Sequence, residues 1–258
     1  VGGSNQVEFT TRAVKDGDEW VINGSKVLIS NIGVADAYVI LTVTGEKVDP
    51  ATRSGMSVFI IDAGTPGLEI GKHETKLGWH GSATGSISFK NCRLPQDALV
   101  GPLHGGMTAM FVSATDEFMS CGPVGLGMAE AAYEMALNYS LERVQCGQSM
   151  FDRFELTRHK LVKMYTEIES LRALVYSTTM RKDAGDLCLA HGRLLKAKGY
   201  EVAEYVANEA IQLFGGVGTI VDTGVERFWR DAKVMAIGGA SVEALNEQVA
   251  LMIKNKMI

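Results

Sequence analysis

The longest helical pattern in the chain runs from about Gly106 to Gln145, and it limits the folds that the chain can adopt. Apolar and small residues recur along it at spacings of three and four, as they do on one face of an α-helix. At ~1.5 Å per residue, such a helix would be ~60 Å long, which exceeds the length of a typical globular helix. We therefore expect the second half of the chain to be organised around this element.

Four further helical patterns follow the long one. They cover residues 155–184, 188–214, 225–233 and 242–256, and the loops between them are short. Long helices joined by short loops form up-and-down bundles. Residues 102–258 are therefore predicted to form a helical domain that resembles a four-helix bundle.

Residues 1–101 are predicted to form a β-domain, which makes the fold α+β with two domains. Short runs of β-forming residues alternate there with segments rich in Gly, Pro, Asp and Ser, and no helical pattern lies between them. The string Lys15-Asp16-Gly17-Asp18 predicts one turn, and Asn23-Gly24 predicts a second tight turn. Short strands at this spacing favour an antiparallel barrel or sandwich.

Charge and composition exclude several classes of protein. A net charge of −5 without a basic cluster argues against a nucleic-acid partner. No apolar run reaches membrane-spanning length, so no membrane association is expected. The four cysteines are scattered without metal-ligand spacing, which predicts no metal site and suits a reducing compartment. We expect a cytoplasmic protein, or a mitochondrial-matrix protein if the source is eukaryotic.

Glu117 stands out within the long helical pattern. Its neighbours three and four positions away are small, so its carboxylate would project from a shallow patch with room for a ligand. The spacing alone favours a solvated glutamate on the surface of a helix.

Seven strings in order along the chain carry a further signal. They are GSNQVEFTT, DGDEWVINGSKVLISN, KLGWHGS, ERVQCGQ, FELTRHKL, QLFGGVG and VERFWRDAKVMAIGGAS. Each resembles a motif of the acyl-CoA dehydrogenase family of flavoproteins, and together they span essentially the whole chain. Because members of that family carry an additional helical domain before the β-domain, the resemblance implies a fragment that lacks this domain.

The resemblance moves the catalytic base to the long helix. Most of the family uses the glutamate of a YEGT string, and the matching string here is Ile237-Gly238-Gly239-Ala240. A minority of the family, including isovaleryl-CoA and long-chain dehydrogenases, carries the glutamate on the helix after the β-domain instead. That helix position falls on Glu117, so the resemblance implies that Glu117 is the base.

The resemblance also implies the remaining site residues. Those implied for binding FAD are Leu28, Ile29, Ser30, Arg143, Phe154, Gln212, Phe214, Gly215, Gly216, Ala240 and Ser241. Those implied for binding an acyl-CoA substrate are Ser4, Ser82, Thr115, Phe118 and Gly239. The backbone amide of either Gly238 or Glu117 would hold the thioester oxygen.

Several positions depart from the family pattern or allow a structural role. Leu28 replaces the aromatic residue that covers the flavin, and Phe118 replaces an arginine beside the base. Ser30 could simply end a strand, Gly215-Gly216 could cap a helix, and Arg143 could be solvated.

The implied function is FAD-dependent α,β-desaturation of an acyl-CoA thioester, with electrons passing to an electron-transfer flavoprotein. An acyl-CoA reductase or oxidase relative, or a non-catalytic homologue that acts as an assembly partner, are the alternatives. Glu117 and Arg143 are 26 positions apart, or ~39 Å along a straight helix. One FAD cannot contact both, which predicts at least a dimer, and the family is a homotetramer built as a dimer of dimers.

Overall fold

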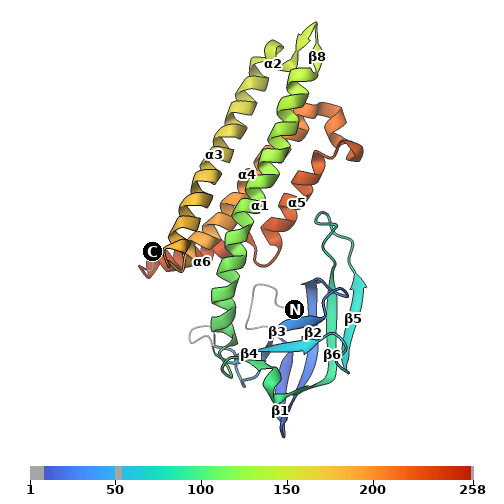
Figure 1. The fold of residues 1–258 in the computed structure, drawn as a ribbon, viewed down its shortest axis with the longest axis vertical. Helices are drawn as coiled ribbons and strands as arrows, with labels where there is room; N and C mark the ends of the chain where they lie inside the picture. The colour runs from blue at the N-terminus through green and yellow to red at the C-terminus, as the bar shows by residue number, and fades with distance from the viewer. Residues whose placement is uncertain (1–8, 50–53, 257–258) are drawn as a thin grey trace. The chain divides into compact units, whose positions relative to one another are not determined.

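The computed structural model describes residues 9–49 and 54–256, and these form two compact units. The first unit comprises Val1–Lys76 and His80–Ser113, and the second comprises Leu77–Trp79 and Ala114–Ile258. A β-sheet dominates the first unit and helices dominate the second, which confirms the predicted α+β fold class (Figure 1).

The first unit is built on a sheet of seven strands in the order β5-β6-β2-β1-β3-β4-β7. The strands are β1 (Arg12–Asp16), β2 (Glu19–Ser30), β3 (Ala37–Val43), β4 (Met56–Asp62), β5 (Leu68–His73), β6 (Thr84–Pro95) and β7 (Leu99–Val100), with a short 3₁₀ helix η2 (Gln96–Ala98) before β7. Every pairing is antiparallel except β1 with β3, which is parallel. The sheet is therefore mixed, whereas the sequence predicted purely antiparallel strands.

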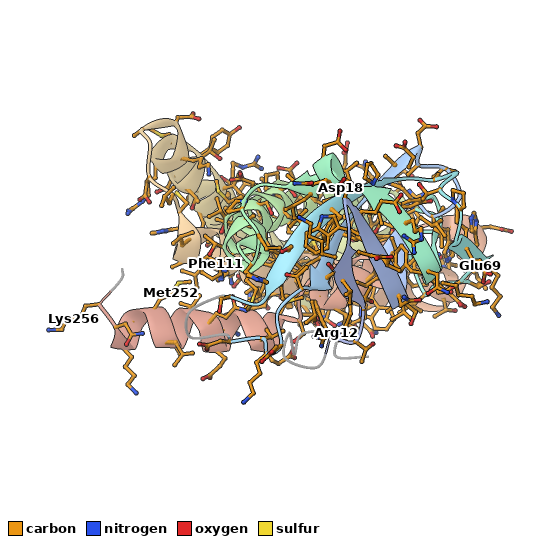
Figure 2. All side chains as sticks on the ribbon, turned by 90° about the horizontal axis from the view of Figure 1, so that it is seen from below. Arg12, Asp18, Glu69, Phe111, Met252 and Lys256 are labelled. Atoms are coloured by element: carbon orange, nitrogen blue, oxygen red, sulfur yellow. The ribbon has the colours of Figure 1, made fainter. Side chains whose placement is uncertain are left out.

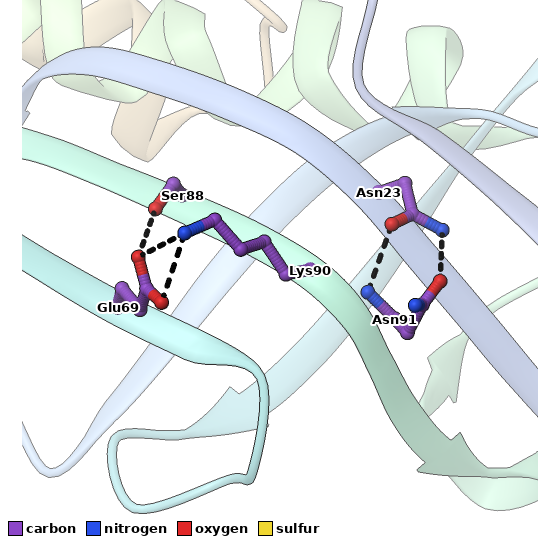
Figure 3. Close-up of polar contacts among 5 residues, drawn as sticks. All are labelled: Asn23, Glu69, Ser88, Lys90 and Asn91. Carbon is purple, nitrogen blue, oxygen red and sulfur yellow. Dashed lines mark hydrogen bonds and ion pairs between the residues drawn. The ribbon is translucent and has the colours of Figure 1, made fainter.

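The predicted turn at Asn23-Gly24 is wrong, because β2 continues through it. The register between β2 and β6 shifts at this point, so the two residues form an irregularity within a continuous strand. The Asn23 side chain accepts from the Asn91 amide at 2.8 Å and donates to the Asn91 side chain at 3.2 Å (Figure 3). These bonds stabilise the left-handed backbone of Asn91. The turn after β1 is found where it was predicted, between Asp16 and Glu19.

Alternation of buried and exposed residues places the core of the first unit on one side of its strands. The side chains of Trp20, Ile22, Phe59 and Ile87 are buried together, with the Trp20 and Phe59 rings edge to face at 5.3 Å. Charged side chains such as Asp18 and Glu69 lie at the surface (Figure 2). Glu69 there accepts bonds from Lys90 and Ser88 of β6 (Figure 3).

The second unit contains five long or medium helices, four of which end within three residues of their predicted ends (Figure 1). The helices are α1 (Gly106–Glu142), α2 (Met150–Arg153), α3 (Glu155–Asp183), α4 (Leu189–Phe214), η3 (Gly215–Thr219), η4 (Val221–Thr223), α5 (Glu226–Ile237) and α6 (Val242–Lys254). A small hairpin of β8 (Val144–Gln145) and β9 (Gln148–Ser149) follows α1. The first eight residues of α1 belong to the first unit and the rest to the second.

Glycines let α1 and α4 approach each other closely. A Cβ built on Gly125 would lie 2.4 Å from the carbonyl oxygen of Gly199, and one built on Gly199 would lie 2.9 Å from the carbonyl oxygen of Cys121. Alanine and leucine side chains of α1, α3 and α4 fill the adjoining core. Backbone contact between α1 and α4 thus sets the spacing of the side chains that these two helices present.

Among the described residues, no helix combines the length and the hydropathy that a membrane crossing requires. All four cysteines are free thiols.

Candidate functional site

Glu117 lies on α1 with its side chain exposed. Two of its small neighbours bond back onto the helix. The Ser120 hydroxyl donates to the Glu117 backbone carbonyl at 2.7 Å, and the Cys121 thiol donates to the same oxygen at 3.6 Å. Because both donors are directed at the backbone, they leave the Glu117 carboxylate accessible to other groups.

Gly239 faces this carboxylate from the loop between α5 and α6. The loop is a tight turn in which the Ala240 amide donates to the Gly238 carbonyl at 2.9 Å, and Gly239 has a φ of 73°. That φ lies in the left-handed region that favours glycine. A Cβ built on Gly239 would lie 2.6 Å from Oε1 of Glu117. The carboxylate therefore occupies space that only glycine leaves open, and the structure brings these two predicted site residues together.

Two cations of α4 are buried here, and one of them bonds to the same loop. Lys196 and Arg193 are each 1% exposed. The Lys196 ammonium donates to the Gly238 carbonyl and, at 2.7 Å, to the Ala240 carbonyl. The Arg193 guanidinium donates to Gln248 at 2.7 Å. Although Phe118 stands where the family pattern has an arginine, α4 supplies two buried cations next to it.

Phe118 and Thr115 belong to the packing around these cations. The Phe118 ring is 5% exposed and contacts both, with its centroid 5.2 Å from Nζ of Lys196 and 5.5 Å from Cζ of Arg193. The Thr115 hydroxyl is buried and accepts from Arg193 at 3.3 Å. The structure therefore places both residues, predicted as substrate contacts, against α4.

Burial controls the ionisation of this cluster. It lowers the pKa of the Lys196 ammonium, while the neighbouring Cys121 and Glu117 side chains act in the opposite direction. Burial also raises the pKa of the Cys121 thiol above its usual value; the Lys196 charge lowers that pKa and the Glu117 side chain raises it, both by smaller amounts. The thiol is therefore uncharged at neutral pH.

A second group of predicted residues meets at the far end of α1. A cavity of about 590 Å³ lies where α1 and α4 end. Its lining includes Arg143, Gln212, Phe214, Gly215 and Gly216, all of which the sequence predicted as cofactor contacts. The volume falls within the range of small-molecule sites, roughly 300 to 1,000 Å³.

The chemistry of this cavity fits an anionic ligand that also carries an aromatic ring. The Arg143 side chain is exposed there, and within the described part of the chain no carboxylate forms an ion pair with it. Phe214 stacks on Tyr139 at a centroid distance of 4.3 Å and forms an apolar wall. Gly215 has a φ of 65°, and a Cβ on either Gly215 or Gly216 would meet no atom within 4 Å. The glycine pair therefore ends α4 and also keeps the cavity open.

The predicted flavin-facing tripeptide ends β2 in the first unit. Leu28 has a φ of 56°, which is unusual for a leucine, and its side chain is 69% exposed. The register between β2 and β6 shifts between Lys26 and Ile29, which gives Leu28 its unusual backbone. Ile29 packs against the core of the sheet, whereas Ser30 pairs with Thr84 and is exposed.

Ser82 and Ser241, two further predicted site residues, are not among the residues that line the 590 Å³ cavity. Ser82 lines a hollow of about 260 Å³ with His73, Lys76 and His80 in the first unit. The Ser241 hydroxyl accepts from the Ala244 amide and caps α6.

The remaining predicted positions are less informative. Phe154 precedes α3 and is 37% exposed, outside the residues that line the 590 Å³ cavity. The Gly238 amide, one of the two predicted donors to the thioester oxygen, donates to the Val234 carbonyl at 2.9 Å. Ser4 lies outside the described residues.

Two of the motif strings contact each other within the second unit. The Trp79 amide donates to the Asp231 carboxylate at 2.6 Å, and the Arg230 guanidinium donates to the Leu77 carbonyl at 2.9 Å. A Cβ on Gly78 would lie 2.6 Å from the Asp231 carboxylate. Arg230 and Asp231 of α5 thus bind the backbone of Leu77–Trp79.

Sequence reasoning missed Lys196, which bonds directly to the loop beside Glu117. In the string LLKAKGYE, Lys196 and Lys198 look alike, and lysine is normally exposed. Lys198 lies at the surface in an ion pair with Glu167. Only the packing of α4 against α1 and α5 separates the two lysines, although a lysine on the apolar face of a predicted helix is a usable warning signal.

Comparison with known proteins places these observations in one family. The acyl-CoA dehydrogenase middle domain matches residues 1–92, and the acyl-CoA dehydrogenase C-terminal domain matches residues 104–253. A probable acyl-CoA dehydrogenase, fadE25 of Mycobacterium bovis, is 35% identical over 91% of this chain and 60% of its own length.

Solved structures with similar folds lead to the same family. Butyryl-CoA dehydrogenase from Megasphaera elsdenii matches with a TM-score of 0.91 and 31% identity, over 98% of this chain and 65% of that one. A chain in the structure of the electron transferring flavoprotein of Acidaminococcus fermentans matches with a TM-score of 0.91 and 32% identity, over 97% of this chain and 65% of that one.

The chain thus spans about three fifths of the length of the curated relatives that it matches. The two domain profiles together cover most of its residues, in the order that the motif strings predicted. The chain belongs to the acyl-CoA dehydrogenase family, whose members are flavin-dependent.

Proposed function

We propose that this chain carries the catalytic base of an FAD-dependent acyl-CoA dehydrogenase. The observation that supports the proposal most is the fit of the Glu117 carboxylate into the space above Gly239. In the reaction, Glu117 removes a proton from Cα of the acyl thioester, and a hydride leaves Cβ, which produces the α,β-unsaturated thioester. Bound FAD supplies the hydride acceptor at N5 of its flavin ring.

Glu117 is suited to this task by its surroundings. An α-proton of a thioester is weakly acidic, so the base must be held close to it with its charge unblocked. The small residues on either side of Glu117 leave that room, and glycine at 239 prevents a clash with the carboxylate. The usual glutamate position of the family is Gly238, so the loop contributes no second carboxylate.

The cofactor contacts divide between two places. Leu28, Ile29 and Ser30 would hold the flavin ring, as the family resemblance implies. Arg143, Gln212 and Gly215 would hold the pyrophosphate and adenine end of an FAD in the 590 Å³ cavity. Arg143 directly follows α1, which carries Glu117, so the two residues are ~39 Å apart along the helix. Each would therefore contact a different FAD, which supports a homo-oligomer such as the dimer of dimers typical of the family.

Acyl-CoA is the proposed substrate, with Ser4, Ser82, Thr115, Phe118 and Gly239 as its proposed contacts. The electron acceptor is proposed to be an electron-transfer flavoprotein. The similarity of this chain to a chain in the structure of such a flavoprotein supports that proposal.

The test is a Glu117→Gln substitution in the intact protein. Turnover is measured with a series of acyl-CoA thioesters of different chain length and branching, and bleaching of the flavin band is followed without oxygen. Removing a general base is expected to lower the rate of bleaching by about 10² to 10⁴-fold, with flavin content and thioester binding retained. The matched control is Asp116→Asn, because Asp116 is the adjacent carboxylate and pairs with Lys182 at 2.6 Å instead of facing Gly239. This control is expected to bleach at the normal rate.

Other outcomes assign other functions. Normal bleaching by the Glu117→Gln variant would eliminate Glu117 as the base. Rapid reoxidation of the bleached enzyme by oxygen would favour an oxidase relative. Bleaching by a reductant together with saturation of an enoyl thioester would favour a reductase. If the intact protein binds no flavin, the chain belongs to a non-catalytic homologue.

A further inference from the structure

Packing alone does not explain why a lysine stands at position 196 of α4. Lys196 is 1% exposed in a region otherwise filled by apolar side chains and glycine backbone. A buried ammonium costs free energy unless it is bonded, and a hydrophobic side chain of similar volume is often at least as stabilising. Its retention at this position therefore suggests a task beyond filling space.

The bonds of Lys196 converge on the loop that accommodates Glu117. Its ammonium donates to the carbonyls of Gly238 and Ala240, which flank the left-handed Gly239. Nζ lies 3.6 Å from the place that a Cβ on Gly239 would occupy, and Oε1 of Glu117 lies 2.6 Å from the same place. The lysine is thus bonded to both carbonyls that flank the glycine that the carboxylate faces.

The charges around the ammonium make Glu117 its electrostatic partner. Of the side chains facing it from α1, Cys121 is an uncharged thiol and Phe118 presents its ring face. From its own helix, Arg193 contacts the same ring with Cζ 5.5 Å from the centroid, and the α5–α6 loop contributes two carbonyl oxygens. Glu117 is therefore the carboxylate whose charge acts on the Lys196 ammonium, against the effect of burial on the pKa of that ammonium.

We propose that Lys196 is a positioning residue for the base. It fixes the Gly238–Ala240 turn, which faces the Glu117 carboxylate, through two carbonyl bonds and places a positive charge beside that turn. This inference rests on the proposed function of Glu117, and Lys196 would act through the turn and not on the substrate.

The test is a double-mutant cycle in the intact holoenzyme. The Lys196→Met variant removes the charge and both bonds, whereas Lys196→Gln removes the charge and keeps an N–H donor group on a shorter side chain. Both are expected to lower the rate of anaerobic flavin bleaching by at least about 10-fold, because a small displacement of the turn that faces the base disturbs its reactive position, with KM and flavin content unchanged. In the Glu117→Gln background, Lys196→Met is expected to change the residual rate less than 2-fold, because the partner on which Lys196 acts has gone.

Lys198 provides the matched control for Lys196. Lys198→Met removes a surface lysine two residues away that pairs with Glu167, and it is expected to leave bleaching unchanged. If Lys196→Met slows both backgrounds equally, or if Lys196→Gln matches the wild type, Lys196 has a structural role alone and the inference is overturned. If Glu117→Gln itself bleaches normally, the proposed base fails, which the single variant reveals without the cycle. Thermal melts of each variant identify any loss of rate that is due to unfolding.

Discussion

The close approach of α1 and α4 makes a quantitative prediction about stability. In a Gly125→Ala variant, the new Cβ would lie 2.4 Å from the carbonyl oxygen of Gly199 and 2.7 Å from its carbon. Ordinary contact begins near 3.4 Å, so the two helices must separate locally by about 1 Å. The obstacle is backbone on a second helix, which cannot rotate away as a side chain can. Overpacking of this kind costs roughly 1 to 3 kcal/mol.

Gly127→Ala is the matched control, because Gly127 lies in the same helix and a Cβ there would meet no atom within 4 Å. Both substitutions gain the same helix propensity, up to about 1 kcal/mol, so this gain cancels in the difference between them. Urea unfolding followed by far-UV circular dichroism should therefore show Gly125→Ala to be less stable than Gly127→Ala by roughly 1 to 3 kcal/mol. The corresponding difference in Tm is about 2 to 12 °C. Equal stability of the two variants, within about 0.5 kcal/mol, would refute the argument that backbone contact sets the helix spacing.

Three further predictions concern backbone strain and pH. Leu28→Gly should raise the free energy of unfolding by up to about 1 kcal/mol, because it relieves the left-handed backbone of a leucine that is 69% exposed. Val27→Gly, at the next position, should lower that free energy by about the same amount. Urea titration measures both variants, and a lower stability of Leu28→Gly would contradict the strain argument. Gly215→Ala should cost about 1 to 3 kcal/mol because its φ is 65°, and Gly216→Ala, where φ is ordinary, should be nearly neutral in the same titration. Burial lowers the pKa of Lys26 to about 8, so the folded chain releases this proton at a lower pH than the unfolded chain does. The free energy of unfolding should therefore rise by about 1 to 3 kcal/mol between pH 8 and 10.5. The Lys26→Met variant should lack this rise, and identical pH profiles of the variant and the wild type would contradict the prediction.

Local pattern was sufficient for the secondary structure. The helices over α1, α3, α4 and α6 follow from spacings of three and four in the sequence, and their ends lie within three residues of the predicted ends. The exception is Asn23-Gly24, where a strong turn signal lies inside β2. Pairing with β6 on one side and β1 on the other keeps the strand continuous there, and the Asn91 side chain completes the irregularity. Strand pairing in a sheet outweighs the preference of two residues for a turn.

The parallel pairing of β1 with β3 likewise could not be read from the sequence. Strand runs are recognised by alternation, but alternation does not say which strands are neighbours or in which direction they pair. The pair joins only Arg12 with Val43 in register, which is too short to leave a sequence signal.

For the site, the sequence by itself determined that glycine stands at the usual base position, and it predicted Glu117 as the base and the group around Arg143 and Gln212 as cofactor contacts. This was possible because the motif strings occur in the same order as in the family, so each position can be matched from the sequence alone. Only the tertiary structure decided that Gly239 makes room for the carboxylate, and that Lys196 and not Lys198 lies beneath it. These relations join α1, α4 and the α5–α6 loop across more than 100 positions. They depend on how closely the glycines of α1 and α4 let the two backbones approach, and that distance is a property of packing.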